Sequence, residues 1–458
     1  MRLTRLFLGL AAFVGIGAAL ASPAPPARAQ APAPAPAQPP QTATATPPNP
    51  DEILGHITVV AGATRPLPKI GVLPSLAAEM EDVTLRSVVR RDLDLCGEFE
   101  VLSDDKAPEG LYLADSPVDV KAWGAKGVEA VVKVTGKKIS ADKAELRGQA
   151  FLVRHGDKPA FDRRFQVPLS SLRAESHRIA DLIIGALTGQ NGGFASRMTF
   201  ASGSGSLRRV FTIDADGHDA RAASPPERVA ISPAFGKGED LYYAASGKGE
   251  EYRVFSASGQ GPLALPVKGS VYGLAFSRDR SQVALSIGVG STIKVFTGPD
   301  FANIKPASEI GMALHPVFTP SGKLAFAGEG KYSQRIFVDG KPISPDGLFA
   351  SAPTFCNHPD GVKAIFAVGV GKQTDLVASG ETGGGLGRLT QNQGSNGYPA
   401  CSPDGRLVAF FSTRKSGEGP GLYIMRVDGL RPKRISNLLG DSLRWDPLPP
   451  GKAVEVKN

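Results

Sequence analysis

The sequence predicts an α+β protein with two domains, a small N-terminal α/β domain followed by an all-β six-bladed β-propeller. The chain has 54 Gly and 38 Pro among 458 residues, which favours many short strands and turns over long helices. Helical periodicity is found before residue 192, and from residue 194 one three-stranded unit recurs about every 42 residues. We therefore divide the chain into a signal peptide (1–29), a linker (30–51), an α/β domain (52–192), a propeller (194–449) and a tail (450–458).

The first residues predict export from the cytoplasm. Arg2 and Arg5 precede an apolar stretch that runs from Leu6 to Leu20, and residues 27–29 fit a small-x-small cleavage site. No run of 18 apolar residues follows, so we expect the mature chain to be soluble. Residues 30–51 are rich in Pro and Ala, cannot form a core, and are expected to be an extended tether.

Residues 52–192 combine strand and helix patterns, which indicates one α/β domain. Helices are expected at about 79–96 and 120–124, and a third runs to about Leu187 with Ser170 and Ser171 as its cap. The expected strands are 57–60, 70–74, 99–102, 129–134, 144–154 and 161–169.

The clearest copy of the repeat is Cys401–Gly429, which consists of a strand, a Ser-Pro-Asp-Gly turn, a strand, a loop and a third strand. In each copy the first strand ends in an aromatic residue or Cys before a turn, and we call these residues the anchors. They are Phe235, Phe276, Phe318, Phe355 and Cys401, with spacings of 41, 42, 37 and 46 residues, and Trp445 in a partial sixth copy 44 residues later. This period is typical of a β-propeller.

The two ends of the propeller sequence are incomplete in complementary ways. Residues 441–449 supply an inner strand and its turn, whereas Met198–Gly217 supply outer strands without an inner one. We expect these two segments to combine into one blade, because closing the ring removes unpaired strand edges.

The three cysteines do not form a disulfide framework, since their number is odd. Cys356 and Cys401 both lie in apolar, strand-like surroundings. We interpret them as small buried hydrophobic residues in preference to a bridge between them, although the sequence leaves the bridge open.

Patterns that carry chemistry or nucleic-acid binding are missing from the sequence. The net charge of +8 is spread over doublets, and the six His residues do not have metal-ligand spacing. No G-x-S-x-G occurs, and the Asp-rich stretch 214–219 favours a hairpin turn over a calcium loop. We therefore assign no catalytic, cofactor-binding or metal-binding residues and expect no nucleic-acid partner.

The blades resemble the propeller repeats of the TolB family, periplasmic proteins of the bacterial Tol–Pal envelope system. Outside the propeller, residues 57–74 resemble the family's N-terminal strand pair. Trp123 with Gly127–Val132 is similar to its "W…G-x-D-A-V-V" segment, and Leu187–Phe194 to its interdomain junction. The likeness is collinear and covers about 400 residues.

This resemblance implies a non-enzymatic, monomeric periplasmic adaptor with two protein partners. It links a TolA-type inner-membrane protein to a Pal-type peptidoglycan-associated lipoprotein, and so associates peripherally with the outer membrane. Its implied role is in outer-membrane integrity and envelope constriction during cell division. The TolA-type partner would recognise residues 52–64 by strand addition. The residues implied in this segment are Glu52, Ile53, Ile57, Val59, Val60 and Thr64.

The Pal-type partner would bind one mouth of the central channel, where loops lead into the inner strands. The residues implied there are Ser270, Tyr272, Leu314, His315, Asn396 and Tyr398. The alternative is a secreted propeller enzyme, a lactonase or glycan-processing hydrolase, with a metal in the channel. That enzyme needs several carboxylates or His on the inner strands, which instead carry Ala, Phe, Pro and Thr, with His358 isolated. We therefore prefer the adaptor.

Overall fold

The computed structural model describes residues 50–55, 66–76 and 79–456. The expected signal peptide, almost all of the linker and the expected strand 57–60 lie outside these residues. In the part of the chain described, no helix is both long enough and apolar enough to cross a membrane.

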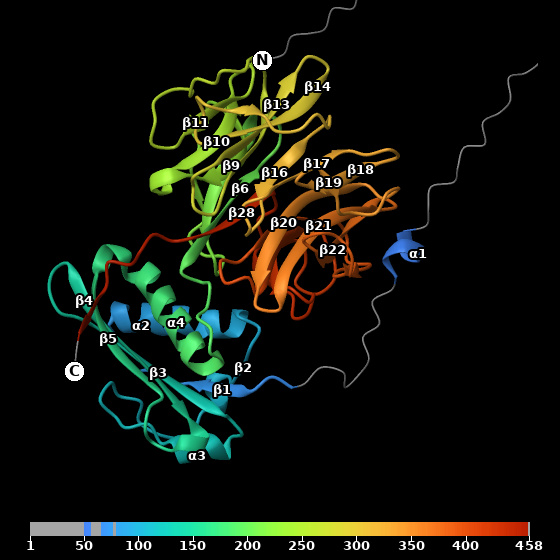
Figure 1. The fold of residues 1–458 in the computed structure, drawn as a ribbon. Coiled ribbons are helices and arrows are strands. Elements are labelled where there is room, and N and C mark those ends of the chain that lie inside the picture. The colour runs from blue at the N-terminus through green and yellow to red at the C-terminus, as the bar shows by residue number, and fades with distance from the viewer. Residues whose placement is uncertain (1–49, 56–65, 77–78, 457–458) are drawn as a thin grey trace, which may run out of the picture. The chain divides into compact units, whose positions relative to one another are not determined.

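The N-terminal domain is built on a six-stranded mixed sheet (Figure 1). Its strands lie in the order β2 (Glu100–Val101), β1 (Lys69–Val72), β3 (Ala130–Lys138), β4 (Lys143–Leu152), β5 (Phe161–Pro168) and β29 (Val454–Val456). β1 pairs in parallel with β2 and β3, whereas β4, β5 and β29 continue the sheet antiparallel.

Helices cover both faces of this sheet. α2 (Met80–Leu95) and α4 (Leu172–Thr188) pack on one face, where Leu85, Leu93 and Ile183 are fully buried. On the other face, Trp123 of α3 (Val120–Ala125) packs against the sheet. A Cβ at Gly71 would lie 2.3 Å from the Trp123 ring, so this contact requires glycine on β1.

The predicted cap of α4 is wrong in its detail. Ser171 occupies the N-cap position, but its side chain caps no helix amide, and its Oγ donates to the carbonyl oxygen of Pro168 at 3.2 Å. The reason is a short 3-10 turn at residues 169–171, which precedes the helix and uses this hydroxyl locally. The remaining short helices are α1 (Pro50–Leu54) and 3-10 turns at 104–106, 153–155, 205–207 and 237–239.

The second domain is a six-bladed β-propeller, as the repeat predicts (Figure 1). Five blades are consecutive in sequence, and each runs from an inner strand at the channel outward. They are β9 (Val229–Phe235), β10 (Leu241–Ser246) and β11 (Arg253–Ser256); β12 (Val271–Phe276), β13 (Val283–Val289), β14 (Thr292–Gly298) and β15 (Lys305–Pro306); β16 (Leu314–Phe318), β17 (Leu324–Glu329), β18 (Gln334–Val338) and β19 (Lys341–Pro342); β20 (Ala350–His358), β21 (Gly361–Val370), β22 (Gln373–Gly380) and β23 (Gly387–Arg388); and β24 (Asn396–Cys401), β25 (Leu407–Ser412), β26 (Gly421–Arg426) and β27 (Lys433–Ser436).

The sixth blade joins the two ends of the propeller sequence, which confirms the predicted ring closure. Its inner strand β28 (Asp441–Pro447) pairs with β6 (Ser196–Ser202), followed by β7 (Arg209–Asp214) and β8 (Arg221–Ala222). Trp445 lies opposite Met198 in this pairing, and its indole N–H donates to Ser196 Oγ at 2.7 Å. The last inner strand is therefore held to the first outer strand by a ladder and a buried side-chain hydrogen bond.

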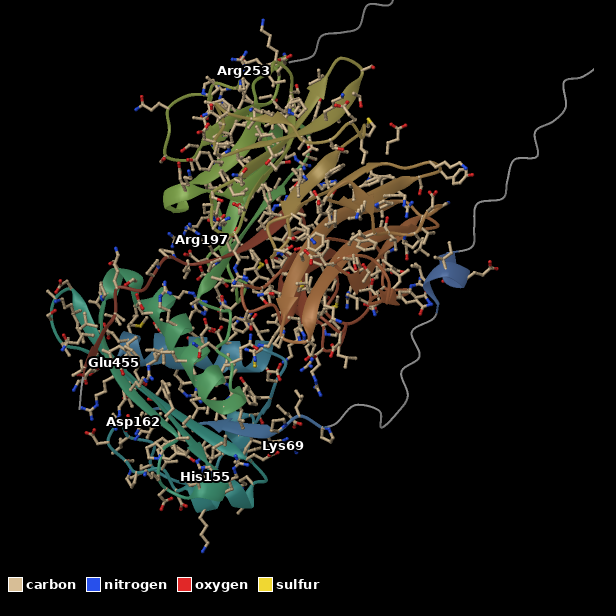
Figure 2. All side chains as sticks on the ribbon, in the orientation of Figure 1. Lys69, His155, Asp162, Arg197, Arg253 and Glu455 are labelled. Carbon is tan, nitrogen blue, oxygen red and sulfur yellow. A yellow bond between two sulfur atoms is a disulfide. The ribbon has the colours of Figure 1, made fainter. Side chains whose placement is uncertain are left out.

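The C-terminal tail carries an element that the sequence did not predict. Beyond β28 the chain reaches the N-terminal sheet, where β29 pairs with β5 and Glu455 forms an ion pair with Arg163 at 3.6 Å (Figure 2). The backbone N–H of Lys452 donates to the buried Glu175 of α4 at 2.8 Å. The same C-terminal segment therefore completes a blade and extends the sheet of the other domain.

A disulfide joins Cys356 and Cys401, so the interpretation of both as unpaired buried residues is wrong. The two residues lie on the neighbouring inner strands β20 and β24, with Cα atoms 5.2 Å apart. This distance is within the range that a disulfide spans without backbone movement. The third cysteine, Cys96, is buried and free.

We predict that the double variant Cys356→Ala/Cys401→Ala loses about 4 kcal/mol of unfolding free energy, the chain-entropy value for a loop of this length. The sequence separation of the two cysteines is 45 residues. The measurement is urea unfolding of the non-reduced chain, with Cys96→Ala as the matched control at a buried free cysteine. An unchanged urea midpoint in the double variant, or three titratable thiols in the unfolded, non-reduced chain, would contradict the bridge.

Candidate partner-binding surfaces and the domain junction

The central channel has two mouths of different composition. In the five blades that are consecutive in sequence the inner strand is followed by a short turn, whereas the loops that precede inner strands and the loops that join second to third strands lie at the opposite end. We call the end where inner strands begin the leading mouth, and the end where they finish the trailing mouth. The residues implied by resemblance for a Pal-type partner belong to the leading mouth.

Five of the six inner strands have a left-handed residue at the β-bulge near the leading mouth. These residues are Ser232, His315, Ala352, Tyr398 and Ser442, with φ between 49° and 54°. Each lies where the register of the inner strand shifts against its neighbour. Bulges re-aim side chains, and non-glycine residues in this region cost about 1–3 kcal/mol each, so the surrounding blades must enforce them.

His315 and Tyr398 meet at this mouth although they belong to non-adjacent inner strands. Their rings form an edge-to-face contact with centroids 5.8 Å apart. Burial, together with the nearby Arg444, lowers the pKa of His315 to about 4, and burial raises the pKa of Tyr398. Both side chains are therefore neutral near pH 7.

The other predicted mouth residues differ in accessibility. Tyr272 is exposed, Leu314 is half-buried, and Ser270 is half-buried with its Oγ accepting from the Tyr252 N–H at 3.3 Å. Asn396 is fully buried, and its amide donates to the Gly394 carbonyl at 3.1 Å. Asn396 is the first residue of β24 and pairs with Ser412, so it supports the mouth from inside the blade and offers no rim contact.

The structure adds exposed apolar side chains that the sequence prediction missed. Eight large hydrophobic residues of the propeller are exposed, and seven of them lie in loops or strand ends on the side of the leading mouth. These seven are Leu207, Tyr272, Val289, Met312, Tyr332, Phe349 and Leu439. Leu430, between β26 and β27, lies on the other side. The sequence signal was an apolar residue inside a polar turn, as at Tyr332 between Gly330 and Ser333.

The described part of the N-terminal segment forms a short helix. Glu52 and Ile53 lie in α1, Leu54 is buried among propeller side chains, and Asp51 pairs with Arg388 at 2.6 Å. Ile57, Val59, Val60 and Thr64 lie outside the described residues. The start of the segment is thus helical, where the resemblance implied an added strand.

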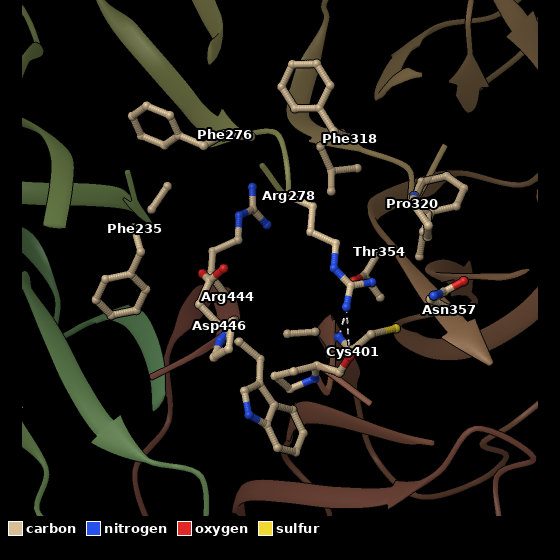
Figure 3. A pocket seen from close by; sticks show the side chains of 18 of the residues that line it. Phe235, Phe276, Arg278, Phe318, Pro320, Thr354, Asn357, Cys401, Arg444 and Asp446 are labelled. Atoms are coloured by element: carbon tan, nitrogen blue, oxygen red, sulfur yellow. Dashed lines mark hydrogen bonds between the residues drawn. The ribbon is translucent and has the colours of Figure 1, made fainter. Parts of the chain in front are cut away.

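All six anchors line one cavity of about 160 Å³ at the trailing mouth (Figure 3). Its lining contains the guanidinium groups of Arg278, Arg280 and Arg444 and a single carboxylate, Asp446, and it contains no histidine among the described residues. Divalent metals in enzymes require several carboxylate or imidazole ligands. This lining therefore lacks the ligand set that the alternative enzyme needs.

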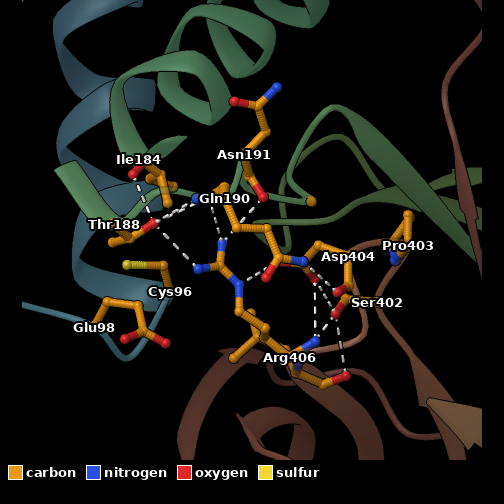
Figure 4. A network of polar contacts seen from close by, with 12 residues as sticks. Cys96, Glu98, Ile184, Thr188, Gln190, Asn191, Ser402, Pro403, Asp404 and Arg406 are labelled. Atoms are coloured by element: carbon orange, nitrogen blue, oxygen red, sulfur yellow. Dashed lines mark hydrogen bonds and ion pairs between the residues drawn. The ribbon is translucent and has the colours of Figure 1, made fainter. Parts of the chain in front are cut away.

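The trailing side also carries the junction with the N-terminal domain (Figure 4). Arg406, directly after the Ser-Pro-Asp-Gly turn, donates to the carbonyl oxygens of Gln190 at 3.3 Å and Asn191 at 3.1 Å, and pairs with Asp404 at 2.8 Å. A Cβ at Gly193 would lie 2.8 Å from the Asp404 carboxylate. The clearest copy of the repeat is therefore the part of the propeller that holds the domain linker.

A buried charged cluster reinforces this junction. His177 of α4 bonds Asp92 of α2 through Nδ1 at 2.7 Å, and Arg173 bonds Asp214 at 2.7 Å and also Asp216 after β7. Ligand atoms of Asp92, His177 and Asp216 lie within 4.8 Å of one another, a spacing that a metal ion could use. Arg173 already occupies Asp216, however, and a protonated His177 supplies the positive charge that the carboxylates need. We therefore interpret the cluster as an ion network between the domains.

The electrostatics of the cluster favour a charged His177. Burial opposes the imidazolium, but the charge and hydrogen bond of Asp92, with help from Asp216, outweigh it and raise the pKa of His177. Burial raises the pKa of Asp92 to about 6. Burial alone would raise the pKa of Asp216, but the positive charges of His177 and Arg173 outweigh it, so the pKa of Asp216 is lowered. Arg91 donates to the Asp216 carbonyl oxygen at 2.8 Å, and His218 contacts the Asp216 carboxylate at 3.1 Å.

Comparison with known proteins identifies the N-terminal part of the chain. Residues 55–153 match the family model of the TolB amino-terminal domain. Residues 55–153 are thus similar to the amino-terminal domain of TolB proteins. The Tol-Pal system protein TolB of Thiobacillus denitrificans is 31% identical over 180 residues, which is 39% of this chain and 41% of that protein. TolB of Albidiferax ferrireducens is 28% identical over 162 residues, or 35% of this chain and 37% of that protein.

The crystal structure of TolB from Acinetobacter baumannii has the same fold. It superposes with a TM-score of 0.67 at 20% identity and covers 84% of this chain and 97% of that chain. The resemblance to TolB and the layout of an α/β domain before a six-bladed propeller are thus confirmed. The alignments span about two fifths of the length of the curated TolB relatives.

We predict that His177→Gln destabilises the chain in a pH-dependent way. The raised folded pKa of His177 means that its stabilising charge is fully present below the unfolded value of about 6.5 and is lost as pH rises through the folded pKa. Gln can still bond Asp92 but carries no charge. The difference in unfolding free energy between the two chains should therefore be largest at pH 6 and shrink towards pH 9 in urea titrations. A difference that stays constant or grows with pH would contradict a charged His177.

Proposed function

We propose that this chain is a periplasmic adaptor of the Tol–Pal system that binds two envelope proteins and catalyses no reaction. The observation that carries the proposal is the concentration of seven exposed hydrophobic side chains on the leading side of a TolB-like propeller. Tyr332, in the β17–β18 loop, is 72% exposed, and Phe349, directly before the inner strand β20, is 53% exposed. A concentration of exposed apolar side chains on one side of a folded protein favours a protein-binding site.

The partner of this surface is a Pal-type peptidoglycan-associated lipoprotein. The name of the relatives, Tol-Pal system protein, supports membership in that system. His315 and Tyr398, both uncharged, form a rim with Tyr272 and the other exposed apolar side chains of this side, and this rim offers apolar contact area together with hydrogen-bonding groups. Such a rim suits a stable protein interface better than a nucleic acid or a charged small substrate. Binding through this lipoprotein would place the chain at the outer membrane.

The second partner is a TolA-type inner-membrane protein that recognises residues 52–64. Support comes from the position of this segment before the sheet of the TolB amino-terminal domain. Docking through Asp51 and Leu54 holds the start of the segment at Arg388, on the outermost strand of the β20–β23 blade. The two partners would therefore use separate surfaces, and linking them would support outer-membrane integrity and envelope constriction during division.

The test uses pull-downs from envelope extract with two variants, each of which should lose one partner and keep the other. Tyr332→Asp/Phe349→Asp should weaken capture of the Pal-type lipoprotein at least about tenfold, because charge is placed in a desolvated contact. The same variant should retain the TolA-type protein. Deletion of residues 52–64 should have the reverse effect.

Leu430→Asp is the matched control, since it also replaces an exposed apolar side chain, but on the trailing side. It should leave both captures unchanged. Equal loss of the lipoprotein in Leu430→Asp would contradict a specific leading surface. Retention of both partners by the folded leading-surface variant would contradict the proposed site.

A further inference from the structure

The cavity at the trailing mouth has more positive than negative charge in its wall. Arg280 pairs with Asp446 at 2.5 Å. Arg278 is exposed and donates to the Pro403 carbonyl oxygen at 3.4 Å, and Arg444 of β28 contacts the carbonyl oxygens of Leu274 on β12 and Pro316 on β16, two inner strands that are not adjacent to β28. Among the described residues, neither Arg278 nor Arg444 forms an ion pair. Three guanidinium groups thus share one carboxylate.

Arg444 is the arginine of this wall that has a buried donor without a hydrogen-bond partner in the described chain. Its Nη2 donates to the Pro316 carbonyl oxygen at 3.0 Å, while its Nε is buried without a hydrogen-bond partner in the described chain. Burial lowers the pKa of this guanidinium, and the charge of Asp446 works in the opposite direction. A buried cation with a free donor is stabilised by an anionic acceptor.

The rest of the wall is apolar. Phe235, Phe276, Phe318, Phe355 and Trp445 surround the guanidinium groups, and Figure 3 shows arginine side chains extending into the space between the rings of Phe276 and Phe318 and the carboxylate of Asp446. The volume of about 160 Å³ is close to that of a cavity known to hold benzene. The space therefore fits a body of about the size of one six-membered ring.

The cavity remains accessible at the trailing mouth, on the side away from the blade that contacts the domain linker. The hydrogen bonds to the domain linker come from residues 404–406, in the turn between β24 and β25. Arg278 lies in the turn after β12, which belongs to a different blade from residues 404–406, and its side chain is exposed. A small solute can therefore reach the guanidinium groups without parting the two domains.

We infer that the trailing mouth binds a small organic carboxylate whose body is a single six-membered ring. Its carboxylate would accept hydrogen bonds from Arg278 and Arg444, since guanidinium groups match carboxylates in geometry and charge. Its ring would lie among the aromatic anchors. This inference does not rest on the proposed adaptor function, because it uses the opposite end of the channel.

The test is calorimetric titration of the purified chain with benzoate. We expect saturable binding at one site. Benzamide, which has the same shape without charge, and inorganic phosphate, which has charge without a ring, should each bind at least about tenfold more weakly. Equal binding of benzamide or tighter binding of phosphate would overturn the assignment. N-acetyl-phenylalanine represents a peptide C-terminus, and tighter binding of this longer molecule than of benzoate would contradict a free small carboxylate.

Two variants with opposite effects locate the site. Arg278→Gln should weaken benzoate binding about tenfold, the loss of one charge-assisted hydrogen bond. Asp446→Asn should tighten it, because it removes the carboxylate that competes for Arg280. Arg253→Gln, at an exposed arginine of the third strand of its blade, makes the same change of charge and should have no effect (Figure 2). An unchanged affinity in Arg278→Gln, or a weaker one in folded Asp446→Asn, would overturn the inference.

Discussion

The pairing of β28 with β6 is the constraint on which the rest of the structure depends. The inner strand of the sixth blade comes from residues 441–447 and its outer strands from residues 196–222, so the ring closes only when the two ends of the propeller meet. Closure gives β28 a hydrogen-bonded neighbour in the second strand of its blade, as the other five inner strands have. It also brings Arg444, Trp445 and Asp446 into the channel wall and directs β29 onto the N-terminal sheet.

Closure makes the two ends of the channel chemically different. The anchors and the turns after them gather at the trailing mouth, where the domain linker and the charged cluster around His177 also lie. Some of the polar and charged groups there, such as Arg406 and Asp216, hold the domains together. The leading mouth has instead the bulged residues His315 and Tyr398 and most of the exposed apolar side chains. The leading mouth takes no part in the domain junction and is therefore available for a protein partner.

The sequence was sufficient for the fold because the repeat is recognised from local signals, namely an anchor, a turn and alternating strands. It failed where partners come from distant segments. The disulfide depends on the spacing of neighbouring inner strands. Cys401 is an anchor, but Cys356 follows the anchor Phe355 by one residue, so the repeat did not indicate that the two cysteines lie side by side. Asp92, His177 and Asp216 have no common spacing, and only packing of both domains brings them together. Asn396 was misjudged because the strand β24 begins at this residue.

The central claim is that a protein partner covers the leading mouth and leaves the trailing mouth free. The most direct measurement is hydrogen–deuterium exchange of the full chain with and without the purified Pal-type lipoprotein. The account predicts slower exchange in residues 310–314, 330–333 and 346–350 and unchanged exchange in the turns 277–282, 319–323 and 402–406. Slower exchange in those turns, with the leading loops unaffected, would contradict it.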